Sequence, residues 1–186
     1  MKHNWKPGPM IYPLPVVMVS CGITPEDYNV FAVSWVGTLC SDPPICYISI
    51  KPKRHSHSII KQDMQFAINL VTQELAFQTD RSGLITGSEH HKFEMLDLTP
   101  VRGELIQAPI IKESPINIEC RVKSIVSLGS HDVFISEVVN LQINDNLVEA
   151  DSQTVDLSRA NLIAFSYGNY YMLQNVIGAY GWSKKK

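Results

Sequence analysis

The sequence lacks the signatures of several large protein classes. Among its 186 residues no apolar run is long enough to cross a membrane as a helix, and the N-terminal residues contain no apolar signal core. The net charge is only −2, which gives no electrostatic support for binding nucleic acid or an anionic membrane. We therefore expect a soluble, cytoplasmic protein that binds neither.

The common enzyme motifs are also missing. The chain contains no GxGxxG, no GxxxxGK[ST], no GxSxG and no HExxH. These absences disfavour a Rossmann fold, a P-loop, an α/β-hydrolase nucleophile and a zincin site. They leave open a cofactor that is held by a β-barrel.

Cysteine is scarce and carries no recognisable pattern. The four cysteines, Cys21, Cys40, Cys46 and Cys120, form no CxxC pair, and each lies in or beside an apolar run. In a cytoplasmic protein such residues are typically small, buried and reduced. We expect neither a disulfide nor a structural zinc site.

The length and the hydrophobic content of 45% predict one domain over residues 1–186. Residues 1–14, rich in Pro, Gly and aromatic residues, read as an irregular N-terminal arm that packs somewhere, because Trp5 and Tyr12 are costly to expose. Residues 151–186 read as a C-terminal extension that packs on the main body or on a partner subunit.

Hydrophobic periodicity between these ends predicts mostly strands. Strands are expected at residues 16–20, 30–35, 45–50, 66–71, 116–128, 133–143 and 147–150, and short helices at 56–63, 73–79 and 89–96. The Pro43-Pro44 pair predicts a loop over 36–44, and residues 80–83 a second loop. Over residues 118–123, Glu119 falls on the polar face of an alternating strand. Strands joined by turns, without a βαβ pattern, indicate a largely antiparallel closed sheet.

The stretch from Asn29 to Ser58 is the candidate site. Thr38 and Ser41 offer hydroxyls in a Gly-containing turn, and Lys51, Arg54 and Ser56 follow after the next strand. Phosphate binds such donors, particularly near a helix start. The two groups meet only if neighbouring elements fold back, and a solvated basic loop is the alternative interpretation.

A flat ring system needs a different environment. A slot of backbone atoms and small side chains beside an aromatic wall can hold one. Val33 and Ser34 on a strand could supply the slot, and Trp35 the wall. The competing interpretation places Trp35 in the core.

These residues carry a resemblance. The run NVFAVSWVGTLCSDPPICYISIKPKRHSHSII, the later DRSGLITGSEHHKFEML and the hairpin SPINIECRVKSIVSLGSHDVFISEVVNL resemble the flavin reductase-like proteins of the FMN-binding split-barrel class, most closely the flavoredoxin branch. The resemblance implies a mostly β, antiparallel Greek-key split barrel with short peripheral helices. It also implies bound FMN and a homodimer with the flavin near the subunit interface.

The resemblance further implies residue roles and a reaction. Hydride or electrons would pass through FMN from NADH, NADPH or a redox protein partner to a second acceptor, with no catalytic residue assigned. The residues implied to line the ring are Val33, Ser34 and Trp35, and those implied to approach the ring edge and the ribityl phosphate are Thr38, Leu39, Cys40 and Ser41. The residues implied to hold the phosphate are Lys51, Arg54 and Ser56, with His55 and His57 close by.

Three alternatives stay open on the sequence. The chain could be a non-catalytic electron carrier on the same fold, or an interaction module with an empty barrel. A metal site is the third alternative, with His55 and His57 as a pair on one side of a loop. Adjacent His90 and His91 diverge on a helix and make a poor ligand pair.

Overall fold

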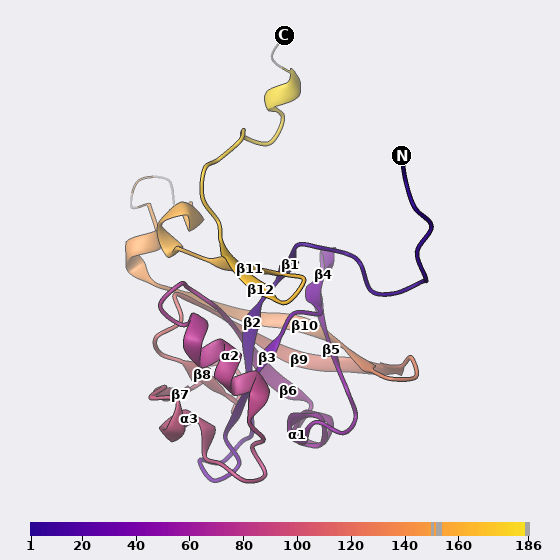
Figure 1. The fold of residues 1–186 in the computed structure, drawn as a ribbon. Helices are drawn as coiled ribbons and strands as arrows, with labels where there is room; N and C mark the ends of the chain where they lie inside the picture. Colours follow the sequence, from indigo (N-terminus) through magenta and orange to yellow (C-terminus); the bar gives the residue numbers. More distant parts are fainter. Residues whose placement is uncertain (150, 152–153, 185–186) are drawn as a thin grey trace.

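The computed structural model describes residues 1–149, 151 and 154–184, and the fold is mostly β. Seven antiparallel strands form the main sheet in the order β3-β2-β6-β9-β10-β5-β4 (Figure 1). The two edge strands, β3 and β4, follow each other in the chain, and β3 also contacts β5, so the sheet curls back on itself. The prediction of a closed antiparallel sheet is confirmed. Its strands are β2 (Val17–Cys21), β3 (Asn29–Val33), β4 (Val36–Ser41), β5 (Pro44–Ile50), β6 (Gln65–Leu70), β9 (Ile116–Ser127) and β10 (Asp132–Ile143).

The remaining elements surround this sheet. A small sheet has the order β1-β11-β12, and β7 pairs with β8. The strands outside the main sheet are β1 (Leu14–Pro15), β7 (Pro100–Arg102), β8 (Pro109–Ile111), β11 (Ile163–Ser166) and β12 (Asn169–Met172). The helices are α1 (His55–Asp63), α2 (Ala76–Leu84) and α3 (Lys92–Met95), with 3₁₀ turns η1 (Asp145–Leu147), η2 (Leu157–Ala160) and η3 (Trp182–Lys184).

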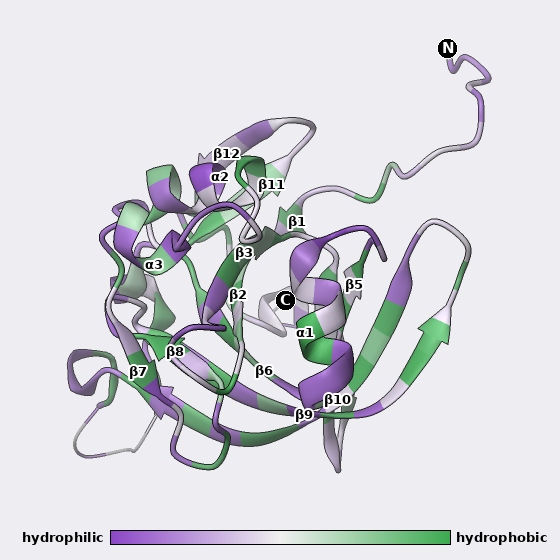
Figure 2. Ribbon diagram, turned by 90° about the horizontal axis from the view of Figure 1, so that it is seen from below, coloured by the Kyte–Doolittle hydropathy of each residue, from purple (hydrophilic) through white to green (hydrophobic). Residues whose placement is uncertain are grey.

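Two hydrophobic clusters explain why residues 16–19 are all apolar. Val17 and Val19 face a cluster inside the barrel, which also contains Phe134 and Ile60 of α1. Met18 faces a second cluster beneath α2 and α3. Figure 2 shows α1 between the β2–β3 hairpin and β5. Strand β2 is therefore buried on both faces, and its apolar residues form a continuous run instead of alternating with polar ones.

The predicted loop over 36–44 is wrong. Residues Val36–Ser41 form β4, which pairs with β5 from Val36↔Ile48 to Ser41↔Pro44. Pro43 occupies the turn and Pro44 opens β5 at its first residue. Neither position needs an N–H for the ladder, so the two prolines are compatible with a tight hairpin.

The predicted helices differ from the structure in their limits. The expected helix at 56–63 is confirmed as α1. The predicted loop at 80–83 lies within α2, where the Thr79 hydroxyl donates to Leu75 O at 2.8 Å and the Ser82 hydroxyl to Thr79 O at 2.8 Å. These bonds to the preceding turn let hydroxyl residues stay in a helix. The helix expected at 89–96 is reduced to α3.

The expected outward position of Glu119 is wrong. Its carboxylate is fully buried and accepts from backbone N–H groups of the 104–106 loop at 2.7 to 3.1 Å. The amides of Asn140 and Gln142 donate to it at 2.9 and 2.8 Å. A buried carboxylate is tolerated when it is hydrogen-bonded in this way. The strand expected at 147–150 is also absent over 147–149, where η1 ends and Val148 makes one isolated bridge, and residue 150 lies outside the described residues.

Of the four free cysteines, Cys40 is exposed, which corrects the expectation that all are buried. The N-terminal arm also differs from the expectation that it packs, since Trp5 is 79% exposed. No helix among the described residues is long and apolar enough to span a membrane. Of the C-terminal extension, residues 152, 153, 185 and 186 lie outside the described part.

Candidate functional site

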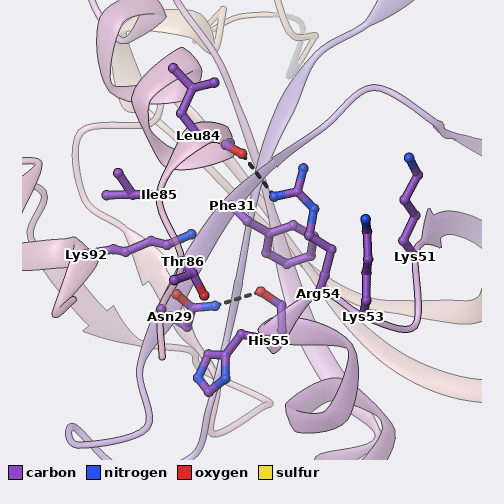
Figure 3. Close-up of a pocket in the computed structure, with 13 residues that line it drawn as sticks. Asn29, Phe31, Lys51, Lys53, Arg54, His55, Leu84, Ile85, Thr86 and Lys92 are labelled. Carbon is purple, nitrogen blue, oxygen red and sulfur yellow. Dashed lines mark hydrogen bonds between the residues drawn. The ribbon is translucent and has the colours of Figure 1, made fainter. Parts of the chain in front are cut away.

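The largest described pocket, about 450 Å³, opens beside the start of α1. It lies between β3, the turn that precedes α1, and the segment that follows α2 (Figure 3). The residues that line it are Asn29, Phe31, Lys51, Lys53, Arg54, His55, Ser56, Gly83, Leu84, Ile85, Thr86, Gly87 and Lys92. The pocket is therefore built from three separate parts of the chain.

The start of α1 suits an anion. Arg54 is the N-cap residue and its side chain makes no cap hydrogen bond, so no side chain occupies the first N–H groups of the helix. A turn closed by Arg54 N and Lys51 O at 2.9 Å brings both cations to this end. Arg54 Nη1 donates to Gly83 O at 3.0 Å, which fixes the guanidinium across the pocket. Free helix N–H groups and cations together favour phosphate-like groups.

Lys92 supplies a buried cation on the other side of the pocket. Its Nζ donates to Val30 O at 2.9 Å and to Ser82 O at 2.8 Å. An ammonium has three protons, so one donor remains for a ligand. Burial, with a smaller effect of the nearby Arg54 charge, lowers the pKa of Lys92 to about 8. Lys92 is thus a cation whose charge depends on pH near neutrality.

Asn29 contributes an acceptor that has no partner. Its Nδ2 donates to Ser56 Oγ at 2.6 Å, while its buried Oδ1 has no hydrogen-bond partner. Gly87 packs against this amide so closely that a Cβ there would lie 2.3 Å from Asn29 Oδ1 and 2.9 Å from His55 Cδ2. Since unpaired buried acceptors are costly, this oxygen is suited to a donor on a ligand.

A second pocket of about 190 Å³ adjoins the first. Phe31, Lys51 and Arg54 line both. The Trp35 ring lies against the His131 ring, with centroids 4.4 Å apart. Burial, and then the charge of Lys51, lower the pKa of His131, which favours the neutral imidazole. The residues that line this pocket are Phe31, Ala32, Val33, Ser34, Trp35, Ser49, Ile50, Lys51, Arg54 and His131.

The structure brings together only part of the predicted site. Val33, Ser34, Trp35, Lys51, Arg54, His55 and Ser56 line the two pockets. Thr38, Leu39, Cys40 and Ser41 are exposed on β4 and line neither described pocket. Thr38 pairs with Cys46, and Lys51 lies five residues further along, about 16 Å at the rise of a strand. The two donor groups are therefore at opposite ends of the β4–β5 hairpin.

His57 also lies outside both pockets. It is buried, and its Nε2 lies 2.8 Å from Asp132 Oδ2. The suggested pairing of His55 and His57 around a metal does not occur, since His55 lines the first pocket. Among the described residues no group of three or more His, Cys, Asp or Glu side chains could hold a metal ion.

The sequence reasoning assigned no role to several pocket residues. Lys92 and Gly87 lie in the segment DRSGLITGSEHHKFEML, and His131 in the turn between β9 and β10. These residues are far from residues 29–58 in the sequence. Only the pairing of β9, β10 and β5 brings the turn that contains His131 to the site. The sequence signal for Lys92 is its position directly before the apolar Phe93, on a short segment that is otherwise polar.

Comparison with known proteins places the chain in a family. The profile of the flavin reductase like domain matches residues 10–164. The chain belongs to the flavin reductase-like family. All residues that line the two pockets fall within the match, whereas most of the N-terminal arm and the last 22 residues fall outside it.

Individual relatives of this flavin reductase-like chain agree with the assignment. An uncharacterized protein of Archaeoglobus fulgidus is 33% identical over 135 residues, covering 73% of this chain and 75% of its own. The Rhizobium rhizogenes protein "FMN reductase (NADH) RutF 2" is 25% identical over 117 residues, covering 62% of this chain and 64% of its own. Flavoredoxin of Desulfovibrio vulgaris superposes with a TM-score of 0.91 and 24% identity over the whole of both chains. The fold is thus the split barrel of these flavoproteins.

Proposed function

We propose that the chain binds FMN across the two joined pockets and acts as an FMN-dependent oxidoreductase. The observation that carries this proposal is the continuity of a cation-lined pocket with a slot walled by Trp35 and His131, through Lys51 and Arg54. FMN has the same two parts, because its phosphate suits the cation-lined pocket and its flat ring suits the slot. The family match and the printed name of the Rhizobium rhizogenes relative support the same cofactor.

The residues present fit each part of FMN. Lys51, Arg54 and Lys92 would hold the phosphate together with the free N–H groups of α1. The unpaired Asn29 Oδ1 would accept from a hydroxyl of the ribityl chain. The ring would lie beside Trp35, in a pocket whose walls include backbone of β3.

FMN supplies reversible two-electron and one-electron chemistry, and the protein supplies position and electrostatics. Electrons would come from NADH, NADPH or a redox protein and leave to a second acceptor. Lys51 and Arg54 would anchor the phosphate so that Trp35 and His131 keep one edge of the ring pocket closed. Trp35 remains 37% exposed, which leaves access for a donor or an acceptor.

Turnover distinguishes an enzyme from an electron carrier on the same fold. We expect the FMN-loaded protein to oxidise NADH or NADPH with free flavin or ferric iron as acceptor, measured as loss of nicotinamide absorbance. Protein without FMN is the control. FMN that stays bound while neither nicotinamide supports turnover would contradict the enzymatic proposal and favour the carrier.

Gly87 tests the fit independently of turnover. Gly87→Ala should weaken FMN binding up to about tenfold, because the added Cβ must displace Asn29 or His55, and a lost hydrogen bond to the ligand costs about 0.5–1.5 kcal/mol. Fluorescence titration measures the affinity, and thermal unfolding reports whether the fold survives. Gly8→Ala is the matched control, since a Cβ at Gly8 meets no atom within 4 Å. If Gly87→Ala binds FMN with wild-type affinity, the side of the pocket formed by Gly87, Asn29 and His55 does not contact FMN.

We also propose that the protein is a homodimer with the flavin near the interface. The exposed β4 segment, with Leu39 54% exposed, supports a partner there. Both chain ends leave the barrel on the same side (Figure 1), and Ile177 and Trp182 on the C-terminal end are 90% and 60% exposed. These exposed apolar side chains are available to pack against a second copy of the chain. Sedimentation equilibrium should give twice the chain mass, and a monomer would contradict the proposal.

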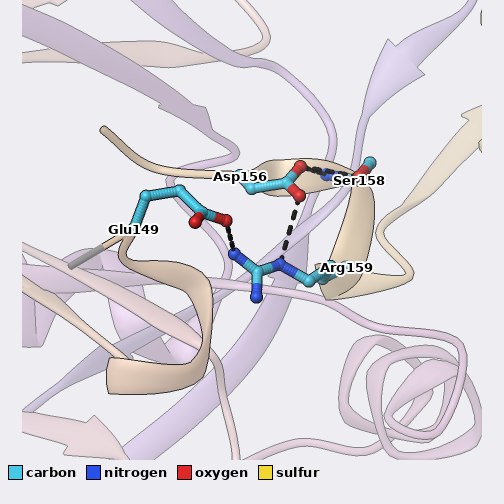
Figure 4. Close-up of polar contacts among 4 residues, drawn as sticks. All are labelled: Glu149, Asp156, Ser158 and Arg159. Carbon is cyan, nitrogen blue, oxygen red and sulfur yellow. Dashed lines mark hydrogen bonds and ion pairs between the residues drawn. The ribbon is translucent and has the colours of Figure 1, made fainter. Parts of the chain in front are cut away.

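The C-terminal extension is anchored before it leaves the barrel. Asp156 accepts from Ser158 N at 3.0 Å and from Arg159 Nε at 3.1 Å, and Arg159 also pairs with Glu149 (Figure 4). These bonds begin η2, which leads to β11. The residues after β12, 173–180, are exposed, and they form the segment available to a second copy.

A further inference from the structure

A buried hydrogen bond connects the two halves of the site at a distance from both pockets. His57 on α1 and Asp132 at the start of β10 are 6% and 8% exposed, and His57 Nε2 lies 2.8 Å from Asp132 Oδ2. The edge of the Phe134 ring packs on His57, with centroids 5.2 Å apart. Neither polar residue lines a described pocket, so a ligand contact does not explain the pair.

Each partner is joined directly to a residue of the site. His57 N donates to Arg54 O at 2.9 Å, so the position of His57 fixes the first turn of α1 and its N-cap. Asp132 directly follows His131, whose ring lies against Trp35. The bond therefore connects the cation turn at one pocket with the aromatic wall at the other.

We propose that the His57–Asp132 hydrogen bond is a positioning contact that holds the His131–Trp35 wall at a fixed distance from the cation turn. The proposal depends on the function proposed above, because FMN would have to reach from that turn to that wall. Without the bond, the β9–β10 turn keeps its backbone hydrogen bond from Leu128 N to His131 O at 2.9 Å, the contact of Ser130 Oγ with His131 Nδ1 at 2.9 Å and the pairing of Asp132 with Ile50, but it loses its side-chain contact with α1. Misplacing the wall would weaken ring binding while the phosphate contacts remain.

The surroundings of the pair are consistent with a hydrogen bond from His57 to an ionised carboxylate. Hydrogen bonds from Ser127 and then His57 lower the pKa of Asp132, and the charge of Lys61 contributes in the same direction. Replacing Asp132 with an apolar residue would leave a buried imidazole N–H without a partner, which is costly. Asparagine keeps an acceptor oxygen at the same place, and it is therefore the conservative variant.

The first test needs no FMN. In a Trp5→Phe, Trp182→Phe background, Trp35 is the only tryptophan, and a protonated imidazole quenches indole emission on contact. Emission should therefore fall as the pH drops through the pKa of His131, whose charged neighbours are Lys51, Arg54 and Asp132. Asp132→Ala should lose most of this change, and Asp132→Asn should retain it.

A matched control separates positioning from loss of a carboxylate. Glu137 lies on the same strand and pairs with Lys123 at 2.7 Å, away from both pockets. Glu137→Ala should keep the wild-type titration of Trp35 emission. Thermal unfolding confirms that each variant is folded at the temperature used. If Asp132→Ala does not fold, His57→Gln should show the same loss. A wild-type titration in a folded Asp132→Ala or His57→Gln protein would overturn the proposal.

The second test uses the flavin. Asp132→Ala should raise the dissociation constant of FMN about tenfold, the usual scale of coupling between contacting groups, and shift the midpoint potential of the bound flavin. Asp132→Asn should restore most of both. Unchanged affinity and potential in Asp132→Ala would overturn the proposal. Wild-type protein that binds no FMN would instead reject the proposed function, while the emission titration would still report whether the bond positions the wall.

Discussion

Replacing Arg54 with Ala should weaken FMN binding by about 1.5–3 kcal/mol, equivalent to roughly 10–150-fold in the dissociation constant. Arg54 lines both pockets, and its guanidinium is held across the first by the bond to Gly83 O at 3.0 Å. Its remaining N–H donors suit phosphate oxygens, which guanidinium binds through two parallel hydrogen bonds. The side chain is exposed, so screening by water and salt favours the lower end of this range.

Two controls make the Arg54 experiment specific. Arg102→Ala removes another exposed arginine, on β7, and should leave the affinity unchanged. Riboflavin, which has the same ring without the phosphate, should bind wild type and Arg54→Ala with much more similar affinities than FMN does. Calorimetric titration gives all four dissociation constants. An equal loss for FMN and riboflavin would show that Arg54 acts on the ring or on the fold and not on the phosphate.

The affinity for FMN should also fall as the pH rises above about 8. Below this value Lys92 is charged and attracts the phosphate, which is already a dianion above pH 7. Above it, the protein without FMN holds a neutral Lys92, so binding must bring a proton back to the amine. Since bound FMN would raise the pKa of Lys92, the affinity should decrease by up to about tenfold per pH unit until the pKa of the complex is reached.

Lys92→Met keeps the length and removes the charge. The variant should bind FMN more weakly than wild type at pH 7, and its affinity should be nearly independent of pH between 7 and 9.5. It also leaves Val30 O and Ser82 O without this donor, so thermal unfolding of the protein without FMN should be checked first. A pH dependence that persists in folded Lys92→Met would show that another group controls the binding.

The sequence predicts the sheet well because its strands alternate or are apolar on both faces. It predicts α1 from its local pattern, and it places Val33, Ser34 and Trp35 together on one stretch of chain, where they line the second pocket. The error at β4 arises because a proline is excluded only where a ladder needs its N–H, and pairing is not visible in the sequence. Glu119 was misplaced because alternation reports an average face, whereas its five hydrogen bonds come from two segments, the 104–106 loop and β10.

The site was harder to predict than the fold because it depends on tertiary contacts. Lys51 and Arg54 were found because they share one turn with the start of α1. Lys92 and His131 were missed because they reach the pocket only after α3 packs on β3 and the β9–β10 hairpin pairs with β5. Thr38 was included because its hydroxyl was expected in an unpaired Gly-containing turn, whereas it lies on β4, and the β4–β5 hairpin separates it from Lys51.

FMN binding by this chain depends on a phosphate site and a ring pocket that are joined through Lys51 and Arg54. The most direct test is titration of the FMN-free protein with FMN, followed by flavin absorbance and Trp35 emission in the Trp5→Phe, Trp182→Phe background. Saturable binding that shifts the flavin spectrum and quenches Trp35 is the predicted result. A flavin spectrum that stays that of free FMN throughout the titration, or binding without any effect on Trp35 emission, would contradict the account.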